Sequence, residues 1–353
     1  MDKPSLYGIK KSNRDFSLRD SWGKNKFNSS FPASLCAYMA SKEVDVNYLT
    51  VNSDGKFVVE EISVTDVFGL DPNDHEEIFY AFESGYSPYN TYVTGSLPRT
   101  DLVIQSFKTK ECIRGLEVKL TALPDNTTCN KNEGLYGSEI VIRPDTIVYL
   151  ACSLIESFES KIPSAIFKDV NITDWEDPQE VIDNCALILD ALETIISSLV
   201  DNETPVLLQP IWKTEGKAPL LSENCLDVFV WSNIGLVRFI HGVSKGILNS
   251  KNQKITRQFR TATWLFKMLY DFSQNQTFDH ERIIDKLSFN VKNDKAFASS
   301  GTTTNIYMKC ENLSKPRIRK DEIKNIILNN GQDLLSPERR FDAIIFNTPN
   351  LFE

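Results

Sequence analysis

The chain contains 353 residues, of which 41% are hydrophobic and 25% are charged, and it carries a formal net charge of −9 at pH 7. This composition suits a globular protein with a sizeable core, and no apolar run approaches the roughly 20 residues of a membrane-spanning helix. The seven cysteines are scattered without a C-x-x-C pair, so we expect neither a disulfide framework nor a zinc cluster. The first residues lack the apolar stretch of a signal peptide, and we expect a reduced, cytoplasmic protein.

The charge is segregated along the chain. Residues 57–98 contain eight acidic residues and no Lys or Arg, whereas residues 228–270 contain seven Lys or Arg and no acidic residue. Segregated charge creates local fields of opposite sign even when the net charge is negative. The distribution therefore permits a DNA partner.

Residues 1–30 form a polar, basic segment in which seven Lys or Arg stand against three Asp, interleaved with aromatic residues. Basic side chains combined with Asn can follow phosphates and reach base edges. The candidates for DNA contacts in this segment are Lys24, Asn25 and Lys26. The alternative is an arm that packs on its own domain with its charges merely solvated.

Three elements are predicted next. A helix is expected over residues 31–41, with Ser30 as its N-cap and Pro32 in its first turn. Residues 47–70 indicate a hairpin around an Asn-Ser-Asp-Gly turn. The acidic stretch 71–84 follows with helical period.

The most informative stretch is 98–119, PRTDLVIQSFKTKECIRGLEVK. Residues 101–107 predict one strand, and residues 112–123 predict a second in which apolar and polar residues alternate. A charged break separates them. We therefore expect a hairpin centred on Thr109.

Such a hairpin sets Asp101 opposite Glu117, since the two are equidistant from its centre. Opposite residues share a face and have Cβ atoms roughly 5 Å apart, and Lys119 lies on that face too. Two carboxylates held together repel each other, and a hard cation such as Mg²⁺ relieves the repulsion. With a lysine to hold or deprotonate water, this is the chemistry of phosphodiester hydrolysis.

An acid-x-Lys triplet alone carries little information, because the chain contains three others: Asp54-Gly55-Lys56, Glu215-Gly216-Lys217 and Glu322-Ile323-Lys324. Only Glu117-Val118-Lys119 lies in a strand-like run with an Asp at the facing position. The alternative, which spacing alone leaves equally open, is a surface hairpin with a solvated cross-strand ion pair.

The order Pro98…Asp101…Glu117-Val118-Lys119 resembles the PD-(D/E)XK nuclease motif, with two additional residues between the Pro and the Asp. The resemblance implies that Asp101 and Glu117 hold Mg²⁺, for which Mn²⁺ can substitute, with help from the Val118 carbonyl, and that Lys119 positions the attacking water. It also implies an α/β (α+β) fold, a PD-(D/E)XK core whose mixed central sheet is flanked by helices, plus mainly helical additions for DNA recognition.

Longer stretches resemble type II restriction endonucleases of the HindVP/HgiDI group. They are PSLYGIKKSNRDF followed by WGKNKFNSSFPASLCAYM, and LEVKLTALPD…YGSEIVIRPDTIVYLAC. The resemblance covers most of the chain. It implies Mg²⁺-dependent cleavage of both strands of double-stranded DNA at a short palindromic site of the GRCGYC kind. It further implies a homodimer, and a companion DNA methyltransferase that acts in function rather than in complex.

Enzymes of this kind often take a further acid from a helix before the motif. The candidates here are Glu76, Glu77 and Glu83. A solvated helix face is the account that we favour for each of them.

Beyond the motif, residues 144–158 and 177–200 predict amphipathic helices, and residues 205–212 and 226–231 predict strands. A hairpin, a long helix and two further strands suit an α/β sandwich with a mixed central sheet. Arg143, just before the first of these helices, could contact a phosphate, and a structural salt bridge explains it equally well.

From residue 233 the chain becomes basic and aromatic, and two helices are expected. The candidates for phosphate contacts on their exposed sides are Lys254, Arg257 and Arg260. A merely solubilising face is the alternative. The candidates for base reading further on are Arg317 and Arg319. A last strand is predicted over residues 341–346.

We therefore expect an N-terminal arm over 1–30, a catalytic core over 31–232, and a mainly helical region for DNA recognition and dimerisation over 233–353. Two other functions stay open. One is a structure-dependent repair or recombination nuclease of the same fold, and the other is a non-catalytic DNA-binding protein whose hairpin is only a surface feature.

Overall fold

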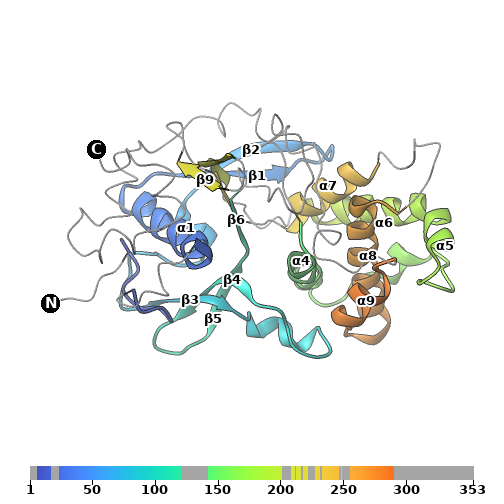
Figure 1. Cartoon of the computed structure of the whole chain (residues 1–353), viewed down its shortest axis with the longest axis horizontal. Coiled ribbons are helices and arrows are strands. Elements are labelled where there is room, and N and C mark those ends of the chain that lie inside the picture. The colour runs from blue at the N-terminus through green and yellow to red at the C-terminus, as the bar shows by residue number, and fades with distance from the viewer. Residues whose placement is uncertain are drawn as a thin grey trace.

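The computed structural model describes residues 6–16, 24–120, 142–200, 208–210, 212–215, 218–221, 227–230, 233–245, 248 and 255–289. A sheet-containing half is followed by a helical half (Figure 1). Between them, strand β6 (Val118–Leu120) rises between helix α1 (Lys24–Ser41) and helix α4 (Pro144–Ser157). No helix in the described ranges is long and apolar enough to cross a membrane.

A three-stranded sheet in the order β3–β4–β5 underlies the first half, formed by Ile78–Ser84, Thr100–Ser106 and Cys112–Leu116. Its two faces bury side chains in different clusters. Leu102 and Ile104 of β4 pack with α1 and with α2 (Val64–Phe68), whereas Val103 packs in the cluster that contains α4. Side chains therefore cover both faces of the sheet. Successive residues of β4 point to opposite faces, so they belong in turn to one cluster and to the other.

Strands β4 and β5 pair in the predicted register. Their partners are Leu102↔Leu116, Val103↔Gly115 and Ile104↔Arg114. Continuing this register by one residue sets Asp101 opposite Glu117, as the hairpin centred on Thr109 requires. A bulge follows Ile104 and shifts the pairs nearer the turn.

The second strand of this hairpin is divided, although residues 112–123 were expected to form one strand. After β5 ends at Leu116, β6 leaves β4 and pairs antiparallel with β10 (Asp227–Val230). Strand β10 also pairs with β7 (Leu208–Pro210), which gives a second sheet in the order β6–β10–β7. Glu117 therefore lies where the chain passes from one sheet to the other.

All pairs of named strands among the described residues are antiparallel, and the expected mixed central sheet is not found there. Two further hairpins are β1–β2 (Val46–Val51, Phe57–Ile62) and β8–β9 (Trp212–Glu215, Ala218–Leu221). Parallel strands need a crossover connection, usually a helix. The connection from β3 to β4 contains only the short 3₁₀ helix η2 (Ser87–Thr91), so these strands run antiparallel. The structure is a mixed α/β arrangement with small antiparallel sheets.

Two predictions in the first half are corrected. Residues 71–84 are not helical: the segment ends in β3, where Ile78, Tyr80 and Phe82 are buried on one face with the period of a strand. Helix α1 begins earlier than predicted, at Lys24, so that Pro32 lies inside the helix and Ser30 is not its N-cap. The hairpin predicted over residues 47–70 is confirmed by β1–β2 up to Ile62, whereas Val64–Phe68 form helix α2.

Residues 6–16 pack onto this half of the molecule, with Leu6, Ile9 and Phe16 buried in the cluster of α1 and α2. Gly8 has φ +74°, and a Cβ at this position would lie 2.3 Å from the Cβ of Ala37 on α1. Only glycine tolerates both the backbone conformation and the close approach. The described part of the expected arm is therefore a packed segment of its own domain.

Among the described residues, the helical half contains α4 and five further α-helices: α5 (Pro178–Asp183), α6 (Cys185–Leu199), α7 (Asn233–Ser244), α8 (Arg257–Asn275) and α9 (His280–Lys286). The helix predicted over residues 177–200 is divided at Asn184, whose side-chain amide donates to the Glu180 carbonyl at 3.0 Å. Helices α7 and α8 share one buried cluster with α4 and α6. The described residues after 232 thus pack in the same core as those before it.

Candidate active site

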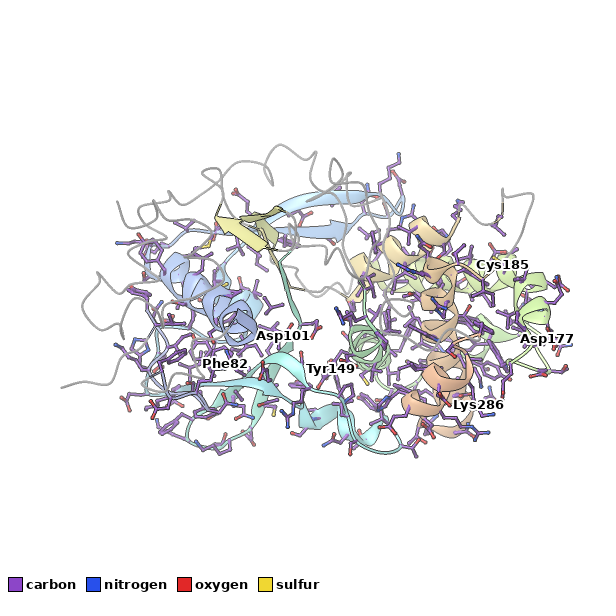
Figure 2. All side chains as sticks on the ribbon, in the orientation of Figure 1. Phe82, Asp101, Tyr149, Asp177, Cys185 and Lys286 are labelled. Atoms are coloured by element: carbon purple, nitrogen blue, oxygen red, sulfur yellow. The ribbon has the colours of Figure 1, made fainter. Side chains whose placement is uncertain are left out.

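Asp101 lies on β4 in the middle of the molecule, beside the helical half that begins with α4. Figure 2 shows it between Phe82, on the neighbouring strand, and Tyr149, on α4. Its side chain is partly buried. The backbone N–H of Val118 donates a hydrogen bond of 2.9 Å to Oδ2 of Asp101. The first residue of β6 is thereby held against β4.

Glu117 precedes this residue at the break between the two sheets, and its carboxylate is held by two hydroxyl groups. Thr146 Oγ1, in the first turn of α4, donates to Oε1 at 3.1 Å, and Thr100 Oγ1 lies 3.2 Å from Oε2. The Thr100 hydroxyl also lies 2.9 Å from the carbonyl oxygen of Leu116. Because a hydroxyl has one proton, Thr146 is the unshared donor of the two.

Helix α4 also holds in place the chain segment that precedes β4 and Asp101. The Tyr149 hydroxyl donates to the Pro98 carbonyl at 2.7 Å and accepts from the backbone N–H of Tyr86 at 3.2 Å. Burial raises the pKa of Tyr149, so its hydroxyl stays protonated and keeps donating. The segment before β4 is therefore tied to the same helix that positions Glu117.

A cavity of about 70 Å³ opens beside Glu117. Its polar lining includes Thr100, Arg114, Glu117, Thr146, Glu156 and Asn233. Glu156 accepts a hydrogen bond of 3.0 Å from the Tyr89 hydroxyl, so this carboxylate of the lining is held in place by a neighbouring side chain. Residues of α4 from Thr146 to Glu156 form one wall. Thr146 lies in the first turn, near the positive end of the helix, which favours negative charge nearby.

A larger cavity, of about 540 Å³, lies away from the motif between α8, α9 and the segment around Trp175. Figure 2 shows Lys286 of its lining far from Asp101. Two of the cations in its lining form ion pairs within that lining, Lys267 with Asp271 and Lys286 with Glu176. This cavity is larger than the one beside Glu117, but neither Asp101 nor Glu117 lines it.

The predicted site residues fall into two groups. The structure brings together Asp101, Glu117 and the backbone of Val118, and it sets Arg143 at the exposed N-cap of α4, three residues before Thr146. The backbone of Lys119 lies in β6, while its side chain is outside the described part. The same holds for the side chains of Lys24, Asn25 and Lys26 on α1.

The basic residues of the second half that were expected to contact DNA differ in their exposure to solvent. Arg257 is partly exposed in the first turn of α8. Arg260 is only 3% exposed, and its Nη1 donates to the carbonyl of Ser288 at 3.2 Å. Burial lowers the pKa of Arg260 to about 10. The expectation that Arg260 lies on an exposed face is wrong, because its position on α8 faces the core beside Trp264. Candidates outside the described residues are Lys254, Arg317 and Arg319.

The acids proposed as a third ligand do not lie on a helix. Glu76 pairs with Lys11, Glu77 with Lys108, and Glu83 with Arg14. Among the described residues, no group of three or more His, Cys, Asp or Glu is arranged to hold a metal ion. The candidate metal ligands among the described residues are the carboxylates of Asp101 and Glu117. Two carboxylates suit Mg²⁺, which usually takes one or two carboxylates and completes its shell with water or phosphate oxygens.

Thr100, Thr146 and Arg14 were not singled out from the sequence. The two threonines stand next to predicted features, one directly before Asp101 and one in the first turn of a predicted helix. No local pattern indicates that this helix docks on the hairpin, which is a tertiary contact. Arg14 carries no signal that separates it from the other basic residues of the N-terminal segment.

Comparison with known proteins places the chain among restriction endonucleases. The chain is 48% identical to "Probable type II restriction enzyme HindVP" of Haemophilus influenzae, over 99% of this chain and 95% of that protein. It is 44% identical to "Type II restriction enzyme HgiDI" of Herpetosiphon aurantiacus, over 100% of this chain and 98% of that protein. The family described as HindVP restriction endonuclease matches residues 22–352. No solved structure matches the chain. The protein belongs to the HindVP restriction endonuclease family.

Proposed function

We propose that this protein is a type II restriction endonuclease that uses Mg²⁺ to hydrolyse both strands of duplex DNA at a short palindromic site, of the GRCGYC kind. The family supports the enzyme class. The observation that carries the chemistry is the juxtaposition of two carboxylates, Asp101 and Glu117, on facing positions of β4 and the end of β5.

Asp101 and Glu117 would hold the cation, together with the Val118 carbonyl. A residue in an extended strand directs its N–H and its C=O to the same side. Since the Val118 N–H reaches Asp101, its carbonyl faces that side as well. When bound, Mg²⁺, or Mn²⁺ in its place, supplies positive charge that offsets the charge building on the phosphate during in-line displacement.

The chain's own groups organise the rest of the site. Thr146 keeps the Glu117 carboxylate in one orientation by its hydrogen bond. Lys119, the residue after Val118 on β6, positions water for attack and can accept or release a proton at Nζ. Arg143, exposed at the start of α4, is available for a DNA phosphate.

DNA would be held by basic groups outside this centre. The candidates are Lys24, Asn25, Lys26, Lys254, Arg257, Arg317 and Arg319. A palindromic target matches a protein of two-fold symmetry, so we propose a homodimer that cuts one strand with each subunit. A companion DNA methyltransferase protects the host's own sites without forming part of the complex.

The test is incubation of purified protein with plasmid DNA that carries GRCGYC sites, with and without Mg²⁺. Discrete bands that require Mg²⁺ and disappear in Lys119→Ala support the proposal, and sequencing of the ends gives the target. The matched control is Lys56→Ala, because Lys56 also ends an acid-x-Lys triplet but lies exposed after the turn of β1–β2.

Other outcomes overturn parts of the proposal. A smear indicates a nuclease of the same chemistry without sequence specificity. DNA that is retained in a gel shift but never cut, under any divalent cation, indicates a binding protein.

A further inference from the structure

The N-terminal segment is built into the edge of the sheet that carries Asp101. Tyr80 of β3 donates its backbone N–H to the Lys11 carbonyl at 3.0 Å, and Asn13 N–H lies 3.3 Å from the Tyr80 carbonyl. The Asn13 side chain then holds Phe82 from both sides, donating to its carbonyl at 2.8 Å and accepting from its N–H at 3.0 Å. These contacts fix the next residue, Arg14, beside Glu83.

Arg14 is a buried cation with a specific set of partners. Its side chain is 6% exposed, and its Nη2 lies 3.4 Å from Oε1 of Glu83. The guanidinium lies 4.5 Å from the ring centre of Phe82, and Nη1 donates to the hydroxyl of Ser30 on α1. Burial lowers the pKa of Arg14 to about 10, while the carboxylates of Glu83 and Asp101 oppose that shift. Arg14 therefore stays positively charged at neutral pH within the electrostatic reach of Asp101.

Glu83 lies directly across from Asp101. The β3–β4 partners on either side are Phe82↔Leu102 and Ser84↔Thr100, so the intervening positions 83 and 101 face each other. Glu83 itself has φ +48°, a left-handed conformation that is uncommon for a residue other than glycine. Strain of this kind persists where the surroundings determine it, and it is concentrated at functional sites.

Three carboxylates thus occupy successive strands: Glu83 on β3, Asp101 on β4 and Glu117 after β5. We propose that Arg14 is a positioning residue of the nuclease site. By pairing with Glu83, it keeps this third carboxylate from adding its charge to the pair that holds the divalent cation. This inference rests on the proposed function, since it assumes a cation at Asp101 and Glu117.

The test is Mn²⁺ binding in the absence of DNA, measured by the electron paramagnetic resonance signal of free Mn²⁺. In Arg14→Gln, Glu83 loses its partner, and the Kd for Mn²⁺ should fall about fivefold to tenfold because an unscreened carboxylate faces Asp101. Adding Glu83→Gln to this variant should restore the parent Kd. In Glu83→Gln alone, the carboxylate that offsets the charge of Arg14 is lost, and the Kd should rise several-fold because more of that positive charge acts on Asp101.

Cleavage separates positioning from metal affinity. Arg14→Gln should cut plasmid DNA more slowly than the parent at saturating Mn²⁺ although it binds Mn²⁺ more tightly, a combination that general loss of structure does not produce. Arg14→Lys keeps the charge and should keep a Kd near that of the parent. The matched control is Lys11→Gln, which removes a cation of the same segment that pairs with Glu76 at 3.3 Å.

The inference is overturned if Arg14→Gln binds Mn²⁺ no more tightly than the parent, or if Glu83→Gln does not reverse the effect. Should Arg14→Gln fail to fold, Glu83→Gln alone decides, and an unchanged Kd overturns the inference. Failure of the proposed function is distinguishable: Asp101→Asn would then bind Mn²⁺ like the parent.

Discussion

The backbone N–H of Val118 lies 2.9 Å from Oδ2 of Asp101 and donates a hydrogen bond to it. This contact joins the first residue of β6 to β4, at the point where the chain leaves one sheet for the other. The Asp101 side chain thus has a structural task, in addition to the binding of the divalent cation that we propose for it.

Asp101→Asn separates these tasks. The Asn carbonyl oxygen can still accept the Val118 N–H, so the free energy of unfolding should change little. Cleavage should fall at least about 100-fold, because the negative charge for the cation is lost and metal ions supply several kcal/mol to such reactions. Plasmid cleavage and urea unfolding measure the two effects. Asp54→Asn, in an exposed turn, is the control, and equal cleavage by Asp101→Asn and the parent would contradict the assignment.

Thr146→Val tests how Glu117 is held. The substitution removes the 3.1 Å hydrogen bond to Oε1 while conserving the shape of the side chain. A hydrogen bond to a charged group contributes about 1.5–3 kcal/mol, so cleavage should fall by about tenfold or more. Thr146→Ser keeps the hydroxyl and should retain most of the rate. If the Val and Ser variants cut equally well, the hydroxyl does not orient Glu117.

Gly8→Ala tests the docking of the N-terminal segment. A Cβ at this position meets Ala37 at 2.3 Å, and φ +74° is unfavourable for alanine. The free energy of unfolding should fall by about 2 kcal/mol or more. Gly95→Ala is the matched control, because Gly95 also has positive φ, +95°, but no atom lies within 4 Å of the added Cβ. Equal losses in both variants would show that residues 6–16 are not tightly packed on α1.

Stability should also depend on the protonation of His241. Burial lowers its pKa; Glu193 opposes this effect, and Arg238 adds to it. Because the folded-state pKa lies below the unfolded value of about 6.5, the unfolded state binds the proton more readily as the pH falls. Stability is therefore fully present above about pH 6.5 and decreases as the pH drops toward the folded-state pKa.

Urea unfolding at pH 7.5 and pH 5.5 measures this dependence, and His241→Gln should reduce it. Some dependence of the same sign should remain, because burial also lowers the pKa of His75. A variant with an unchanged or steeper pH dependence would contradict this role of His241.

The core of the candidate site was predictable because it is local. Alternation of apolar and polar residues over 116–121 and the symmetry of the hairpin about Thr109 predict that Asp101 faces Glu117, and the β4–β5 register, continued by one residue, agrees with this. The division of the second strand at Glu117 was not predictable in the same way. It depends on β6 pairing with β10, a strand far along the chain whose partner no local pattern specifies.

Tertiary contacts bring together the residues around the site, and the sequence predicted these residues less well. Thr146 reaches Glu117 only because α4 docks on the sheet, and periodicity identifies a helix but not its neighbours. Residues 71–84 were expected to be helical from their period, yet burial of Tyr80 and Phe82 on one face stabilises a strand. Arg260 is a further case in which the local pattern did not determine burial: it was expected on the exposed side of a predicted helix, and it is buried.

The hydrogen bonds that join Lys11 and Asn13 with β3 also bear on how two copies of the chain can associate. An unpaired outer strand is a template for another chain, and many proteins extend their sheets across a dimer through such an edge. Here the donors and acceptors of Tyr80 and Phe82 are already occupied by the protein's own N-terminal segment. The two copies of the homodimer that we propose are therefore not expected to pair strand to strand at Tyr80 and Phe82 of β3.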